Sequence, residues 1–329
     1  MPQFGRGKPA AGAFYDSDFS TIDDVLAVAL LFGLQNSNDC RVAVLTMSRP
    51  NLQVAGFVDT VERFYHGPAG NFAQVPPIGM RSEGAAGETS AAFTTPFQKR
   101  KPDGAPVYVN EVKSVIDTAD PVTLIRNYLP AQQDQNGFFV LAGPATNLAA
   151  LLKEPGIQPI ITAKLKQLVI AAGALGADVP AAKKLFAEWP TPIVLVGADV
   201  GAALEFPGAS IDKEFAQVVP DHPIADAYRA YRKMPYDAPS TALAAALFAA
   251  RPADDFTLSA PGTIAIDDAG RTSFTPAEKG THRCLTADPQ KKEAIVQSFV
   301  ALASARPASG RRGGRGVIAP GPPPPAKKN

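Results

Sequence analysis

Four aspartates lie within nine residues near the start of the chain, in the run Asp16-Ser17-Asp18-Phe19-Ser20-Thr21-Ile22-Asp23-Asp24. Carboxylates this close raise one another's pKa and repel, so the cluster is costly to assemble without a partner. A hard cation, or a substrate rich in hydroxyl groups, relieves that cost. A helix start explains Asp23 and Asp24, because their charge complements the helix dipole. It does not explain Asp16 and Asp18, so we expect a ligand site here.

The segments around the acidic run predict strands that alternate with helices. This order favours one mostly parallel central sheet flanked by helices on both faces, a Rossmann-like α/β fold. Strands are expected at residues 13–15, 41–46, 75–79, 138–142, 167–171 and 192–196, with two more in 256–274; helices are expected at 23–34, 52–65, 121–129, from about 147, at 180–188, 222–233, 240–250 and 289–305.

Two of these segments have further consequences. Pro76 and Pro77 confine the third strand to a sheet edge, because proline cannot donate a ladder hydrogen bond. Residues 80–110 are rich in glycine and polar residues and show no period, which predicts a long functional or mobile loop.

Ligands of open parallel sheets bind beyond the carboxyl ends of the strands. Three loops are expected there: the acidic run, the loop that carries Asn51, and Gly143-Pro144-Ala145-Thr146-Asn147. We expect them to converge on one site.

The composition is that of a globular enzyme-like protein, with 46% hydrophobic and 19% charged residues in a 329-residue chain. No apolar run is long enough to span a bilayer, and the N-terminus has no apolar signal-peptide core. Two cysteines, Cys40 and Cys284, fit a reducing compartment. We therefore expect a cytoplasmic protein without a membrane partner.

The last 24 residues differ from the rest of the chain. Residues 306–329 contain six basic and no acidic residues, and eleven of them are Gly or Pro. Such a segment buries too little apolar surface to fold, so we expect a disordered tail. Because the whole chain carries a net charge of +1 and the tail carries +6, residues 1–305 carry about −5. If any part of the chain binds nucleic acid, we expect it to be the tail alone. The predicted organisation is a flexible N-terminus (1–12), one α/β domain (13–305) and this tail.

With these residues placed, the chain resembles the inosine–uridine-preferring nucleoside hydrolase family over residues 14–306. The acidic run is similar to the family's Asp-x-Asp…Asp-Asp signature. The segment 143–149, GPATNLA, is similar to its Gly-Pro-x-Thr-Asn-(Ile/Leu)-Ala motif. The segments 188–194, EWPTPIV, and 238–252, with its Pro-Ser start and closing Arg-Pro, resemble those of one bacterial subgroup.

The resemblance implies a nucleoside hydrolase-like fold and cleavage of the N-glycosidic bond of ribonucleosides. A Ca²⁺ ion would activate a water that attacks the anomeric carbon, and nearby carboxylates would stabilise the oxocarbenium-like state. The resemblance also implies a role for each residue that matches a family position. Asp18 would be a metal ligand and the base, Asp24 a bidentate ligand, and Ala142 a ligand through its backbone carbonyl. Asp16 would be a supporting carboxylate, and Asp23 and Asn51 would bind ribose.

The chain departs from the family pattern at several points. Four residues, not three, separate Asp-x-Asp from Asp-Asp, and the usual Pro-Gly is missing. The late aspartate ligand is replaced by Ala242, for which Asp237 is the nearby substitute, and the ribose-binding Glu-(Phe/Trp)-Asn segment is absent after Gly173. Fewer anionic ligands weaken a calcium site. We therefore expect a divergent member with weak or altered activity.

Two alternatives stay open. A catalytically degenerate member would bind a nucleoside or sugar, or serve as a scaffold, and Ala242 favours it. Asp16-x-Asp18-x-Ser20 after a strand also resembles the nucleophile loop of haloacid-dehalogenase-like phosphohydrolases, in which the first aspartate attacks phosphorus. Assembly into a homo-oligomer, the base preference and the natural substrate are not determined by the sequence.

Overall fold

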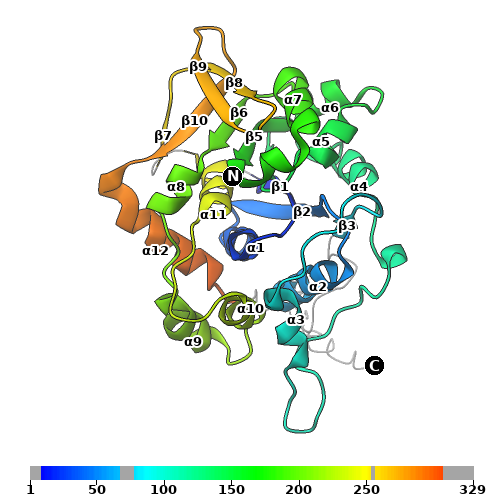
Figure 1. Ribbon diagram of the computed structural model, residues 1–329, viewed down its shortest axis with the longest axis vertical. Helices are drawn as coiled ribbons and strands as arrows, with labels where there is room; N and C mark the ends of the chain where they lie inside the picture. The colour runs from blue at the N-terminus through cyan, green and yellow to red at the C-terminus, as the bar shows by residue number, and fades with distance from the viewer. Residues whose placement is uncertain (1–8, 67–77, 253–255, 307–329) are drawn as a thin grey trace, which may run out of the picture.

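A single twisted sheet runs through the computed structural model, which describes residues 9–66, 78–252 and 256–306 (Figure 1). Its strand order is β3-β2-β1-β4-β5-β6-β10-β8-β9, and β7 pairs with β10. The strands from β3 to β10 in this order are parallel, whereas β7, β8 and β9 are attached by antiparallel pairing.

The bounds of the elements follow the alternation expected from the sequence. They are β1 (Ala11–Ser17), α1 (Ile22–Asn36), β2 (Cys40–Met47), α2 (Leu52–His66), β3 (Ile78–Met80), α3 (Ala91–Thr94), α4 (Pro121–Tyr128), β4 (Gly137–Leu141), α5 (Thr146–Leu151), α6 (Ile157–Lys164), β5 (Leu165–Ala171), α7 (Val179–Glu188), β6 (Ile193–Val196), α8 (Ala198–Ala203), α9 (Ala216–Val218), α10 (Pro223–Tyr231), α11 (Thr241–Ala250), β7 (Phe256–Leu258), β8 (Gly262–Ile266), β9 (Thr272–Pro276), β10 (His282–Ala287) and α12 (Lys292–Ala303).

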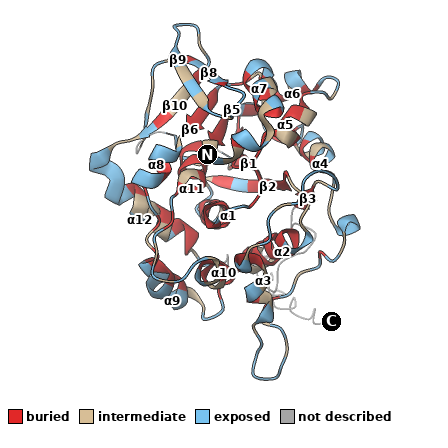
Figure 2. Cartoon of the chain, in the orientation of Figure 1, coloured by how far each residue is buried: buried red, intermediate tan, exposed pale blue. Residues whose placement is uncertain are grey.

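Helices cover both faces of the sheet because its strands are apolar on both sides (Figure 2). On β1, Tyr15 packs into a core with α1, α2, α10, α11 and α12. Its neighbour Phe14 points to the other face and joins a second core with α4, α5, α6 and α7. The three-layer arrangement predicted from the sequence is thus confirmed.

Helix α1 contains the last residues of the acidic run and is buried over most of its length. Residues from Ile22 to Leu34 are all buried, including Asp23 and Asp24. Gly33 lies directly against the backbone of Leu302 in α12, which leaves no room for a side chain at position 33. The first and last helices of the fold are therefore in backbone contact.

Several predicted details differ from the structure. The first strand is longer than residues 13–15, because pairing with β2 and β4 on both sides extends it. Residues 80–110 contain the short helix α3 and a 3₁₀ turn at Thr95–Gln98. Helices α6 and α8 were not predicted, and the region 256–274 contributes to three strands instead of two.

Other details are confirmed. Strand β3 lies at the sheet edge, as the prolines before it predicted, although residues 75–77 lie outside the described residues. The run Asp267-Asp268-Ala269-Gly270, a sequence typical of a hairpin turn, joins β8 to β9. The tail predicted for residues 306–329 lies outside the described residues except for Arg306. Residues 1–8 of the predicted flexible N-terminus also lie outside them, whereas Ala11 and Gly12 are buried in β1, so the prediction for these two residues was wrong. No helix in the described ranges combines the length and apolarity that a membrane span needs.

Glu62, in the buried face of α2, gives a prediction for stability. Both of its carboxylate oxygens are buried without a hydrogen-bond partner among the described residues. Burial, and then repulsion from Asp59, raise its pKa well above the ordinary 4.5. Above that ordinary value the unfolded chain releases a proton that the folded chain retains, so stability falls as the pH rises.

We expect Glu62→Gln to stabilise the fold by about 1–3 kcal/mol near neutral pH, with a smaller gain near pH 5. Thermal denaturation across this pH range measures the effect. The exposed Glu278 provides the matched control, Glu278→Gln, which should leave the pH profile unchanged. Equal gains at both pH values would contradict a protonated, buried Glu62.

Candidate active site

A cavity of about 270 Å³ opens at the carboxyl ends of the central strands. Strands β4 and β5 deliver Ala142 and Ala171 to its wall, and the N-terminal turn of α1 delivers Asp23 and Asp24. The other lining residues come from the acidic run, the turn after β5, the end of α10 and the start of α11: Ser20, Thr21, Ile22, Gly173, Ala174, Tyr231, Arg232, Tyr236, Asp237, Ala238, Pro239, Thr241 and Ala242.

Asp23 joins the start of the fold to the N-terminus of α11. Its Oδ2 accepts a hydrogen bond from the amide of Ala242 at 2.6 Å, and its Oδ1 accepts one from Leu243 at 3.1 Å. The residue before the helix, Ser240, turns its hydroxyl to the carbonyl of Ala238 instead of capping the helix. Asp23 therefore supplies the acceptors that the free amides of α11 require.

Asp24 caps its own helix. Its Oδ2 accepts hydrogen bonds from the backbone amide of Thr21 at 2.9 Å and from the hydroxyl of Thr21 at 3.0 Å. Burial, followed by repulsion from Asp23 and Asp18, raises the pKa of Asp24 well above its ordinary value. Burial also raises the pKa of Asp23 to about 7, against the lowering effect of the α11 amides.

Asp16 lies fully buried at the end of β1, where it contacts the end of β2 and the start of α5. Its Oδ2 accepts hydrogen bonds from the hydroxyl of Thr46 and from Nδ2 of Asn147, each at 2.6 Å. Its Oδ1 has no partner among the described residues, and burial raises the pKa of Asp16 to about 7. The predicted meeting of the acidic run with the segment 143–147 is therefore observed.

Asp18 pairs with an arginine that the sequence reasoning did not consider. The Nε of Arg49 lies 3.5 Å from Oδ2 of Asp18, and the amide of Ser20 donates to Oδ1 at 3.3 Å. Gly143 packs against this loop, since a Cβ there would lie 2.6 Å from the amide nitrogen of Asp18 and 2.9 Å from the hydroxyl of Ser48. Asp16 and Asp18 do not reach the cavity wall that the described residues form.

The side chain of Asn51 forms hydrogen bonds with nearby backbone groups. Its Oδ1 accepts hydrogen bonds from the amides of Gln53 and Val54 at the start of α2. Its Nδ2 donates to the carbonyls of Gly87 and Glu88. Asn51 does not line the cavity formed by the described residues, so its predicted contact with ribose stays a prediction.

An aromatic and cationic part of the cavity wall was missed by the sequence reasoning. Tyr236 stacks on Tyr228 with 4.4 Å between ring centroids, and each tyrosine hydroxyl donates to the other's backbone carbonyl. The guanidinium of Arg232 lies 5.4 Å from the centre of the Tyr236 ring. The available signal was the concentration of tyrosines around Tyr231, near the end of a predicted helix.

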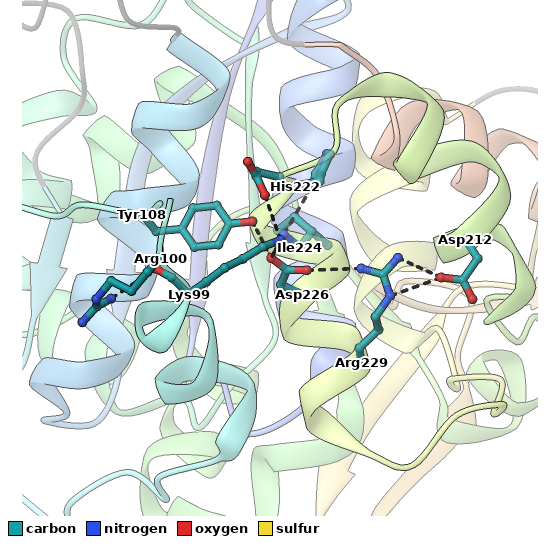
Figure 3. A network of polar contacts seen from close by, with 9 residues as sticks. Lys99, Arg100, Tyr108, Asp212, His222, Ile224, Asp226 and Arg229 are labelled. Atoms are coloured by element: carbon teal, nitrogen blue, oxygen red, sulfur yellow. Dashed lines mark hydrogen bonds and ion pairs between the residues drawn. The ribbon is translucent and has the colours of Figure 1, made fainter. Parts of the chain in front are cut away.

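Helix α10, which carries Tyr231, is held by a polar network (Figure 3). Asp226 accepts hydrogen bonds from Lys99 at 2.7 Å and from the hydroxyl of Tyr108 at 2.6 Å. Arg229 joins Asp226 to Asp212. The segment between α3 and α4 thereby fixes the helix whose end forms part of the cavity wall.

Comparison with solved structures finds chains with a similar overall fold. A plant nucleoside hydrolase superposes with a TM-score of 0.60 at 19% identity, over 90% of this chain and 100% of that one. An inosine–guanosine nucleoside hydrolase gives 0.66 at 16% identity, over 89% and 98%. The type III effector XopQ, solved with adenosine diphosphate ribose, gives 0.64 at 13% identity, over 91% and 96%.

The chain has the nucleoside hydrolase fold. This confirms the fold that the sequence resemblance predicted. Comparison of the sequence with protein-family models and with curated proteins finds no match. The similarity therefore concerns the fold alone, and the chemistry of the site depends on the side chains of this chain.

The calcium ion that the resemblance implies needs several oxygen ligands around one point. Within the described ranges, no three acidic, histidine or cysteine side chains come together as a group that could hold a metal ion. The oxygens of Asp23 face the α11 amides, Asp18 faces Arg49, and the methyl group of Ala242 stands at the late ligand position. Asp237 accepts from the amide of Gly208. As they are arranged, the side chains of Asp18, Asp23, Asp237 and Ala242 do not fit a calcium site.

Proposed function

We propose that the cavity binds a ribonucleoside and that the chain hydrolyses its N-glycosidic bond, releasing the base and ribose. The observation that carries the proposal is the composition of one cavity wall. Asp23 and Asp24 offer carboxylates to sugar hydroxyls, and Tyr231 and Tyr236 offer aromatic surface to a planar base. A nucleoside combines these two chemistries in one molecule. The nucleoside hydrolase fold supports the same assignment.

The reaction breaks the bond between C1′ and the base nitrogen while a water oxygen bonds to C1′. Positive charge develops on the sugar in the transition state, and the neighbouring carboxylates of Asp23 and Asp24 lower its energy. The family resemblance assigns Asp18 as the group that accepts the proton of the water. Asp18 lies beside the cavity, against Arg49, so this role requires the loop that carries it to bring its carboxylate to the water. Ala142, which directly follows β4, contributes to the same wall.

Ribose release from a panel including inosine, guanosine and uridine tests this proposal. We expect ribose from the wild type, and Asp18→Asn should lower the rate by about 10²–10⁴-fold because it removes the general base. The exposed Asp103 supplies the control Asp103→Asn, which should retain the wild-type rate.

A second candidate function is nucleoside binding without cleavage. The pairing of Asp18 with Arg49, together with Ala242 at the late ligand position, favours it. Saturable binding of a nucleoside by calorimetry, with no ribose above the uncatalysed rate, would establish this function. Phosphate release from an aryl phosphate, lost in Asp16→Asn, would instead favour the phosphohydrolase alternative.

A further inference from the structure

We propose that Arg49, Arg81 and the N-terminus of α11 neutralise the acidic cluster in place of a divalent cation, so that ribonucleoside binding by this chain needs no metal. The inference rests on the proposed function, since it concerns the same cavity. It follows from the partners that each of the four clustered carboxylates has within the chain.

The first partner is Arg49, which follows β2. Its Nε lies 3.5 Å from Oδ2 of Asp18, a carboxylate whose side chain is only 6% exposed. An arginine is always charged and presents several donors, so it can satisfy a carboxylate that would otherwise need a cation. The side chain of Arg49 is 27% exposed, and its charge therefore reaches the cluster from the solvent side.

The second partner acts on Asp16 through an amide. Nδ2 of Asn147 donates to Asp16, and Oδ1 of the same amide accepts a hydrogen bond from Nη1 of Arg81 at 3.4 Å. Arg81 follows β3, as Arg49 follows β2. Two neighbouring strand ends thus each contribute one cation to the edge of the sheet where the aspartates gather.

The third partner is the helix N-terminus. Asp23 binds the amides of Ala242 and Leu243, where the helix dipole favours negative charge. An aspartate at position 242 would place a further negative charge within this contact. The alanine found there is consistent with a cluster that is balanced by amides and arginines, and Asp24 adds its own cap at Thr21.

In these contacts, the positive partners of the four aspartates are groups of the chain itself and not a bound cation. A cation in the cluster would have to displace Arg49 from Asp18 and the α11 amides from Asp23 before those oxygens could bind it. The alanine in α11, which departs from the family pattern, and the pairing of Arg49 with Asp18 are therefore explained by one change of chemistry.

The first test uses calcium chloride alone and measures thermal unfolding. The wild type should unfold at the same temperature with EDTA and with calcium chloride. Arg49→Gln should unfold at a lower temperature in EDTA and regain stability with calcium, because it leaves Asp18 without a positive partner. Arg49→Lys, which retains the charge, should behave as the wild type does. Arg41, exposed at the opposite end of β2, supplies the control Arg41→Gln.

The second test uses inosine binding by calorimetry under the same two conditions. The wild-type affinity should be unchanged by EDTA, and Arg49→Gln should bind about tenfold more weakly in EDTA and recover with calcium. Stabilisation of the wild type by calcium, or loss of inosine binding in EDTA, would overturn the inference while leaving the proposed function in place.

Two further outcomes are informative. If Arg49→Gln neither loses stability nor responds to calcium, Arg49 does not balance the cluster and the inference is wrong. If no nucleoside binds under either condition, the proposed function fails, and the calcium arm alone then decides whether the cluster is internally neutralised.

Discussion

Replacement of Asp23 by alanine should destabilise the fold by about 2–4 kcal/mol, because two buried amides of α11 lose their acceptors together. Nucleoside affinity should fall with it, since the same carboxylate lies in the cavity wall. Asp23→Asn should give an intermediate loss, because its amide group offers one acceptor where the carboxylate offers two. Chemical denaturation and calorimetric titration with inosine measure the two effects.

Asp120 provides a matched control for this prediction. It also caps a helix through a carboxylate, by accepting from the amide of Thr123 at 2.8 Å, but it is exposed and does not line the cavity. Asp120→Ala should cost about 1 kcal/mol and leave nucleoside affinity unchanged. A loss at Asp23 no larger than at Asp120 would show that the contact between α1 and α11 adds little.

The second large effect is expected at Gly143. A methyl group there would lie 2.6 Å from the amide nitrogen of Asp18 and 2.9 Å from the carbonyl carbon of Ser17. Both are backbone atoms, so Gly143→Ala has to displace the loop that carries the aspartates. We expect a loss of about 1–3 kcal/mol in stability and at least about tenfold in ribose release, since catalysis depends steeply on position.

Gly176 supplies the comparison for this variant. A Cβ at Gly176 would make only an ordinary contact, 3.5 Å from Gly270. Gly176→Ala should therefore retain stability and activity. A Gly143→Ala enzyme with the wild-type melting temperature and rate would mean that the loop tolerates displacement, and that the Gly-Pro start of the segment has another cause.

The sequence was informative where the signal is local. The apolar run after Asp24 predicted the buried helix α1, and the strands β4, β5 and β6 were predicted within two residues of their bounds. The contact of Asp16 with Asn147 followed from a general property of parallel sheets, namely that neighbouring strands end at one edge. These inferences need only the order and type of nearby residues.

The parts that were missed depend on contacts between distant segments. Asp23 and Ala242 are 219 positions apart, and no local pattern indicates that one caps the helix of the other. Arg49 and Tyr236 reach the cluster and the cavity through loops whose path is set by tertiary packing. The short helices α6 and α8 were missed for a similar reason, because packing stabilises them more than their own sequence does.

The backbone contact between Gly33 and Leu302 has a consequence for the folding of this protein during its synthesis. Helix α1 is synthesised first among the helices, yet its partner α12 emerges last. At typical translation speeds the apolar side of α1 waits roughly 15–50 s for that cover. Nascent chains of this protein should therefore bind chaperones that protect apolar segments until synthesis is nearly complete, and a chain truncated before α12 should aggregate.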